Sequence, residues 1–139
     1  MPYSTQDDIL KRIRKRELDK LIDSSAGEPD SADILTEAIS AADSIIDGYL
    51  KNAVKTLPME DPPEAIVDCS ANIAIFILHS RIQYHNIPQF WKERYDICIS
   101  YLRDVSKGLA NLDKTIDEEE QQDSIKTYYN TNVFNRDIY

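Results

Sequence analysis

The stretch from Ala65 to Tyr84 limits most strongly what this chain can fold into. Apolar residues recur in it at helical spacing on two separate faces. The two faces are Ile66, Cys69, Ile73, Phe76 and Ile77, and Val67, Ala71, Ala74, Leu78 and Ile82. A helix that is apolar on two sides is covered by neighbours on both. The unbroken apolar part, residues 73–78, is much shorter than the roughly 20 residues that a membrane span needs. The stretch therefore predicts a central core helix, and not a membrane span.

Three further helices are predicted around it, so the expected fold is all-α, a small bundle of about four helices. The first begins at a cap on Ser4 or Thr5 and continues, straight or bent, through Ile22. The second runs from an N-cap at Ser31 to about Lys55. The last runs from Pro88 to a left-handed cap at Gly108. The central helix is expected to start at residue 63 or 64 and to end near residues 85–86, after a proline-rich connector.

The second helix is expected to bury an apolar face that reaches Ala53 and to leave its acidic residues, Asp43 and Asp47 among them, on a solvated face. Gly48 lies in the middle of this helix, where glycine costs about 1 kcal/mol against alanine, which suggests that another backbone packs closely there. The residues predicted to carry the packing are Gly48, Tyr49, Ile73, Phe76, Ile77, Trp91, Tyr95 and Leu102.

The chain divides into a helical body, residues 1–112, and a C-terminal part, residues 113–139. Residues 117–123 are an acidic run without apolar partners, which is typical of a solvated linker. The residues after it are apolar and aromatic, so they are expected to form an extended arm that docks on a partner. The predicted docking residues are Val133, Phe134, Arg136, Asp137 and Ile138.

A basic run occupies residues 11–16. Its members, candidates for contact with DNA or with another subunit, are Lys11, Arg12, Arg14, Lys15 and Arg16. The alternative is a solvated helix face that pairs with the protein's own acidic segments. This alternative is favoured, because the 139-residue chain has a net charge of −9 and repels nucleic acid overall.

No catalytic motif is present in the sequence, so no enzyme activity, cofactor or metal is expected. Phosphate-binding loops, nucleophile elbows and paired-histidine metal motifs are missing, and the loop at residues 23–34 lacks most calcium ligands. His79 and His85 are six residues apart, which points them in different directions, so structural roles are expected. Cys69 and Cys98 lie among apolar residues and are expected to be buried free thiols of an intracellular protein.

An ordered set of phrases resembles the small head-completion, or head–tail joining, proteins of Mu-like phages and prophages. These phrases are Tyr3–Ile9, Ile46–Leu50, Leu57–Pro58, Arg94–Asp96, Tyr101–Gly108 and Val133–Asp137. They keep their order and spacing over nearly the whole chain.

The resemblance implies a structural subunit that forms a ring, with about twelve copies, on the portal protein. Its other partner would be a tail-side connector protein, and DNA would pass through the ring without specific recognition. Assembly would take place in the host cytoplasm and the final location would be the virion neck, with no membrane involved. Two alternatives stay open: a nucleic-acid-binding regulator that uses residues 11–16, and a helical adaptor for a cellular partner.

Overall fold

The computed structural model describes residues 1–24, 29–82, 86–110 and 112. Five helices follow one another in this part of the chain, and it contains no strand. They are α1 (Gln6–Leu10), α2 (Lys15–Leu21), α3 (Ser31–Leu50), α4 (Glu64–Ser80) and α5 (Gln89–Ser106). The all-α prediction is confirmed. The acidic linker and the arm, residues 113–139, lie outside the described residues.

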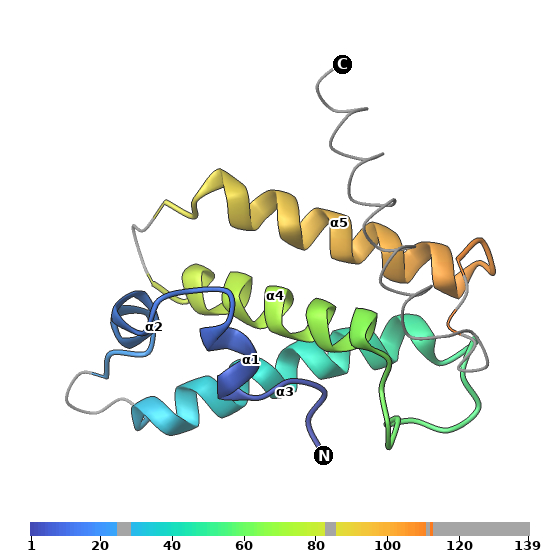
Figure 1. The fold of residues 1–139 in the computed structure, drawn as a ribbon, viewed down its shortest axis with the longest axis horizontal. Helices are drawn as coiled ribbons and strands as arrows, with labels where there is room; N and C mark the ends of the chain where they lie inside the picture. Colours follow the sequence, from blue (N-terminus) through green and yellow to red (C-terminus); the bar gives the residue numbers. More distant parts are fainter. Residues whose placement is uncertain (25–28, 83–85, 111, 113–139) are drawn as a thin grey trace.

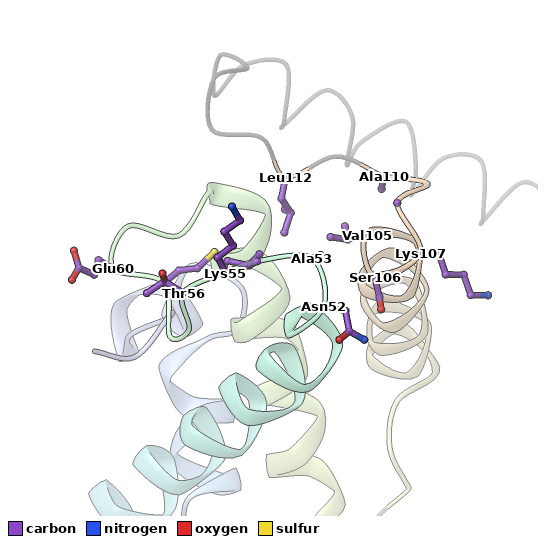
Figure 2. Close-up of a pocket in the computed structure, with 13 residues that line it drawn as sticks. Asn52, Ala53, Lys55, Thr56, Glu60, Val105, Ser106, Lys107, Ala110 and Leu112 are labelled. Carbon is purple, nitrogen blue, oxygen red and sulfur yellow. The ribbon is translucent and has the colours of Figure 1, made fainter.

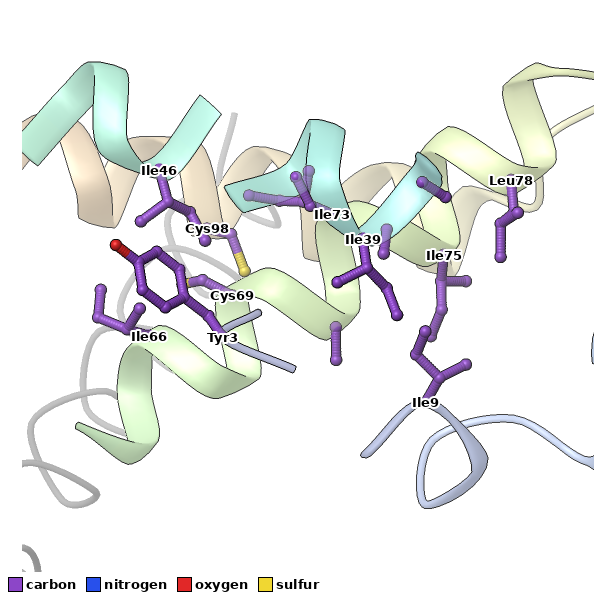
Figure 3. Packing of buried hydrophobic residues seen from close by; sticks show 14 of the residues in the cluster. Tyr3, Ile9, Ile39, Ile46, Ile66, Cys69, Ile73, Ile75, Leu78 and Cys98 are labelled. Atoms are coloured by element: carbon purple, nitrogen blue, oxygen red, sulfur yellow. The ribbon is translucent and has the colours of Figure 1, made fainter. Parts of the chain in front are cut away.

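The three long helices form the body, with α4 between α3 and α5 and with α1 against α4 (Figure 1). The core is built on α4, where Ile66, Ile73, Ile75 and Leu78 are completely buried (Figure 3). Burial of side chains of this size contributes about 1.5–3 kcal/mol each. The predicted central helix is therefore present and central. It ends at Ser80, however, and not near residues 85–86.

The first predicted helix is two short helices joined by a turn at residues 11–14. Thr5 caps α1: its hydroxyl accepts a hydrogen bond from the Asp8 N–H at 3.4 Å, and the Asp8 carboxylate accepts one from the Thr5 N–H at 2.9 Å. The change of direction lets Ile9, Ile13 and Leu18 all enter the core. A continuous helix is thus ruled out, and the basic run lies across the turn.

Helix α3 is shorter than predicted, and its single glycine does not have the predicted packing role. Its N-cap is Asp30, not Ser31, and it ends at Leu50, so Ala53 is exposed in the following turn and not on a buried helix face. Gly48 is exposed, and a Cβ added there would meet no atom within 4 Å. The expected close packing at Gly48 is therefore wrong for this chain, because the glycine lies on the solvent side of the helix.

Helix α5 covers the other side of α4. It buries Trp91, Cys98, Leu102 and Val105, which are spaced at seven, four and three residues. Gly108 has a φ of +78° and donates its N–H to the Val105 carbonyl at 3.0 Å. The left-handed cap predicted at this glycine is confirmed.

The other residues predicted to carry the packing differ in how deeply their side chains are buried. Ile73 and Leu102 are fully buried, whereas Tyr49, Phe76, Ile77 and Tyr95 are partly buried at the edge of the core. The rings of Phe76 and Tyr95 stack with centroids 4.1 Å apart, which joins α4 to α5 outside the core. None of the described helices has the length and apolar character that crossing a bilayer requires.

Candidate functional site

The N-terminal segment is fastened to α3 by Tyr3. This tyrosine is 3% exposed, and its hydroxyl donates a short hydrogen bond to the Asp47 carboxylate. The same hydroxyl accepts a hydrogen bond from the Met59 N–H at 3.0 Å, and the Tyr3 N–H donates to Asp43 Oδ2 at 3.0 Å. Burial, followed by the hydrogen bond to Asp47, raises the pKa of Tyr3 to about 12.

Asp43 extends this network to α4. Ser70 donates its hydroxyl to Asp43 Oδ1 at 2.6 Å, and the Ser4 and Ser70 hydroxyl oxygens are 2.7 Å apart. Since the one hydroxyl hydrogen of Ser70 points at Asp43, Ser4 is the donor to Ser70. Burial raises the pKa of Asp43, and the hydrogen bonds from Ser70 and Tyr3 act against this rise. Asp43 and Asp47 are therefore partly buried anchors, and their assignment to a purely solvated face is wrong.

Beside this anchor lies a groove of about 590 Å³ between the N-terminal segment and the outer side of α3. Its lining combines apolar side chains with hydroxyl groups and with the two aspartates, Asp43 and Asp47. The lining residues that define it are Pro2, Leu35, Ile39, Ser44, Asp47 and Pro58. A groove of this character can hold an apolar side chain that carries a cationic or hydrogen-bonding end.

A second, larger groove lies beyond the C-terminal end of α3, between the α3–α4 loop and the end of α5 (Figure 2). It encloses about 1270 Å³. Its apolar lining consists of Ala53, Val54, Met59, Val105, Ala110 and Leu112. Lys55, Glu60 and Lys107 add charges of both signs, and Leu109, next to it, is 76% exposed. This mixture suits a peptide segment better than a small polar substrate.

The predicted docking residues of the arm cannot be placed against either groove. Val133, Phe134, Arg136, Asp137 and Ile138 lie outside the described residues.

The residues of the basic run differ in whether they form ion pairs with described carboxylates. Arg12 pairs with Asp68 of α4 at 2.7 Å and donates to the Asp8 backbone oxygen at 2.6 Å, and Lys11 lies 3.7 Å from the Asp8 carboxylate. In contrast, Arg14, Lys15 and Arg16 are exposed and form no ion pair with any described residue. Pairing with the protein's own carboxylates thus accounts for the first two cations and not for the other three.

The cysteines and histidines occupy structural positions. Cys69 and Cys98 are buried free thiols, and a hydrogen bond between them, together with burial, raises the pKa of Cys69 (Figure 3). His79 is buried, and its ring lies 6.4 Å from that of Trp91. His85 lies outside the described residues. Across the described part of the chain, no three His, Cys, Asp or Glu side chains gather as a metal site would require.

Residues 3–128 match the family described as Bacteriophage Mu, Gp36. The chain belongs to this family. The Gp36 match includes all five helices, and it ends before the arm residues 133–138. No curated protein matches the chain. The resemblance to Mu-like phage proteins is thus confirmed at the level of the Gp36 family, and the head-completion role is taken up below as a proposal.

The anchor at Tyr3 is the feature of this Gp36 protein that sequence analysis missed. The residues that its hydrogen bonds join are 27 to 66 positions apart in the sequence, so no local sequence pattern connects them. One signal was available: Ser70 and Asn72 interrupt the apolar run of α4, and a polar residue on a core helix needs a hydrogen-bond partner. Both are buried and both have partners, Asp43 for Ser70 and Asp68 for Asn72.

Proposed function

We propose that this Gp36 family protein is a structural subunit of the phage head–tail connector, which completes the head by forming a ring on the portal. The observation that carries the proposal is membership of a Mu phage family over the entire helical body. The ordered phrases from residue 3 to residue 137 support the same role, because they resemble head-completion proteins in particular.

The form of the body suits such a role. Helices α3 and α5 pack against α4 and form one core with it, so the body can act as a rigid unit in an assembly (Figure 1). Its grooves lie on two different surfaces, one at the N-terminal segment and one at the end of α5. A subunit of a closed ring needs separate surfaces for its neighbours and for the layers above and below it.

The partners proposed are the portal protein, a tail-side connector protein and further copies of the chain, about twelve in a ring. The arm residues Val133, Phe134, Arg136, Asp137 and Ile138 would dock on the portal or on a neighbouring copy. A net charge of −9 makes the surface repel phosphate, so DNA would pass through the ring without being held. The proposed location is the virion neck, and no catalytic activity is proposed.

The decisive experiment is quantitative mass spectrometry of purified particles, which compares the copy number of this chain with that of the portal protein. Near-equal numbers are expected for a ring stacked on the portal. Particles that contain portal and tail but lack this chain would end the connector proposal.

A matched pair of variants then tests the arm. Deletion of residues 131–139 should leave the helical content of the body unchanged and remove the protein from particles. Deletion of residues 117–123 keeps the docking residues and serves as the control for chain length. A chain without residues 131–139 that still enters particles would show that the arm does not attach the subunit.

A second candidate, a nucleic-acid-binding regulator, is favoured by one observation: Arg14, Lys15 and Arg16 are exposed and form no ion pair with a described residue. It requires retention on duplex DNA that weakens steeply as salt rises. If the purified chain is not retained on duplex DNA at low salt, this candidate fails.

A further inference from the structure

Helix α2 and its N-cap carry four exposed cations: Arg14, Lys15, Arg16 and Lys20. We call them the α2 cation cluster. None of them lies within ion-pair distance of a described carboxylate, although Glu17 and Asp19 are on the same helix. The neighbouring Lys11 and Arg12 are different, since both are paired within the body. The α2 cation cluster is thus positive charge that this part of the chain does not neutralise.

Three of the four cations are placed where they do not help the helix to form, and only Lys20, in the last turn, is favoured by the helix dipole. Arg14 is the N-cap and makes no capping hydrogen bond with its side chain, and Lys15 and Arg16 are in the first turn. The helix dipole favours negative charge at that end, so three cations there are unfavourable. Arg16 and Lys20 are four residues apart and repel each other. The stability of the helix therefore gives no reason for Arg14, Lys15 and Arg16 at its N-terminal end, whereas an external anionic partner does.

A complementary surface exists on the outer side of α3. Asp30, at its N-cap, Asp33 and Glu37 are exposed, and none of them forms an ion pair with a described residue. We call these three the α3 acidic stripe. Further along the same side the helix carries small exposed residues, Ser40, Ala41, Ser44 and Gly48. Long arginine and lysine side chains can lie flat on such a surface, with their apolar stems in contact with it and their charged ends at the carboxylates.

We propose that the α2 cation cluster of one copy docks on the α3 acidic stripe of a second copy of this chain. The inference rests on the proposed function, because in a ring each copy contacts the next through two different surfaces. A chain with a net charge of −9 repels its own copies at long range. A local contact between opposite charges both overcomes this repulsion and fixes which surfaces meet.

The test uses two full-length variants with reversed charge. The first, Arg14→Glu/Lys15→Glu/Arg16→Glu, makes the cluster acidic, and the second, Asp30→Lys/Asp33→Lys/Glu37→Lys, makes the stripe basic. Each variant alone places like charges at every contact, so its incorporation into particles should fall at least tenfold. Expressed together they can alternate around a ring with opposite charges at every contact, so incorporation should return to the wild-type level.

A double variant on α5, Lys92→Glu/Arg103→Glu, is the control for a change in net charge, and it should be incorporated normally. Circular dichroism of each purified variant shows whether the helices are retained.

The outcomes separate this inference from the proposed function. If the wild-type chain is absent from particles, both fall. If it is present and either reversed variant alone is incorporated normally, the connector role stands and the contact between copies is overturned.

Failure of the mixture to restore incorporation would also overturn the contact. If the first variant in addition loses salt-dependent retention on duplex DNA, the cluster binds nucleic acid instead of a second copy.

Discussion

The Ser70 hydroxyl donates a hydrogen bond to Asp43 Oδ1 at 2.6 Å, which joins the middle of α4 to α3 inside the body. Through the other oxygen of Asp43, the same carboxylate accepts the Tyr3 N–H at 3.0 Å. One side chain thus ties together the N-terminal segment and two long helices. The chain therefore depends at this point on hydrogen bonds as well as on apolar packing.

Replacement of Asp43 by alanine should destabilise the protein by about 1–3 kcal/mol, because it leaves the buried Ser70 hydroxyl and the Tyr3 N–H without their acceptor. Urea unfolding followed by circular dichroism measures the change. Glu37→Ala, at an exposed position beyond the first turn of the same helix, is the control and should stay within about 0.5 kcal/mol of the wild type. Equal stabilities for the two variants would show that the anchor contributes nothing to folding.

The protein should lose stability as the pH rises from 10 to 12. Burial and the hydrogen bond to Asp47 raise the pKa of Tyr3 to about 12, against 10.0 for a free tyrosine. In this range the unfolded chain gives up the Tyr3 proton and the folded chain keeps it, so the free energy of unfolding falls. A shift of this size corresponds to at most about 3 kcal/mol at the upper end of the range.

Burial also raises the pKa of Tyr101, which adds to the loss in the same direction. Urea unfolding at a series of alkaline pH values measures the effect, and ultraviolet absorbance reports the phenolates. The variant Tyr3→Phe should show a shallower loss than the wild type. Identical profiles would exclude Tyr3 as a source of the alkaline sensitivity.

The Arg12–Asp68 pair should contribute about 1 kcal/mol, at the top of the range for surface ion pairs. The side chains are 19% and 22% exposed, and Arg12 Nε and Nη2 both approach Asp68 Oδ1. A double-mutant cycle with Arg12→Ala and Asp68→Ala measures the coupling free energy. The same cycle for Lys11 and Asp8, at 3.7 Å with Lys11 73% exposed, should give a value close to zero. A coupling near zero for both pairs would mean that Arg12 does not fasten α1 to α4.

Both cysteines should resist thiol reagents in the folded protein. Cys69 and Cys98 have no exposed surface, so reagents cannot reach either thiol, and their mutual hydrogen bond together with burial raises the pKa of Cys69, which disfavours its reactive thiolate. An Ellman assay should detect few thiols in buffer and two per chain in guanidinium chloride. Rapid reaction of both thiols without denaturant would show that α4 and α5 separate readily.

Periodicity predicted the long helices because each of them buries a continuous face. Trp91, Cys98, Leu102 and Val105 mark such a face on α5, and the buried isoleucines mark it on α4. The predicted C-terminal ends of α3 and α4 lie several residues beyond the observed ends. Apolar residues that follow a helix can also contact the core, and they extend the apolar pattern past the last helical residue. Val54 and Ile82 do this from turns.

The break between α1 and α2 could not be predicted in the same way. No glycine or proline lies between Leu10 and Lys15 to mark a turn, and the five-residue interval from Ile13 to Leu18 is compatible with a bend as well as with a straight helix. Packing of Ile9 and Leu18 against the rest of the body decides the direction there. The Tyr3 anchor was beyond prediction for a related reason, since it joins residues that only the complete fold brings together.

The burial of Tyr3, only two residues after the exposed Met1, has a practical consequence for anyone who attaches a tag or a reporter to this protein. Met1 is 97% exposed, while Tyr3 is 3% exposed and hydrogen-bonded on both its backbone and its side chain. A fusion that precedes Met1 leaves this attachment intact, and its linker needs no length to clear the protein surface. Trimming the chain by three residues would remove Tyr3 with its hydrogen bonds to Asp43, Asp47 and Met59, and would leave Ser4 and Ile9 to hold the segment, so shortening at this end should stop at two residues.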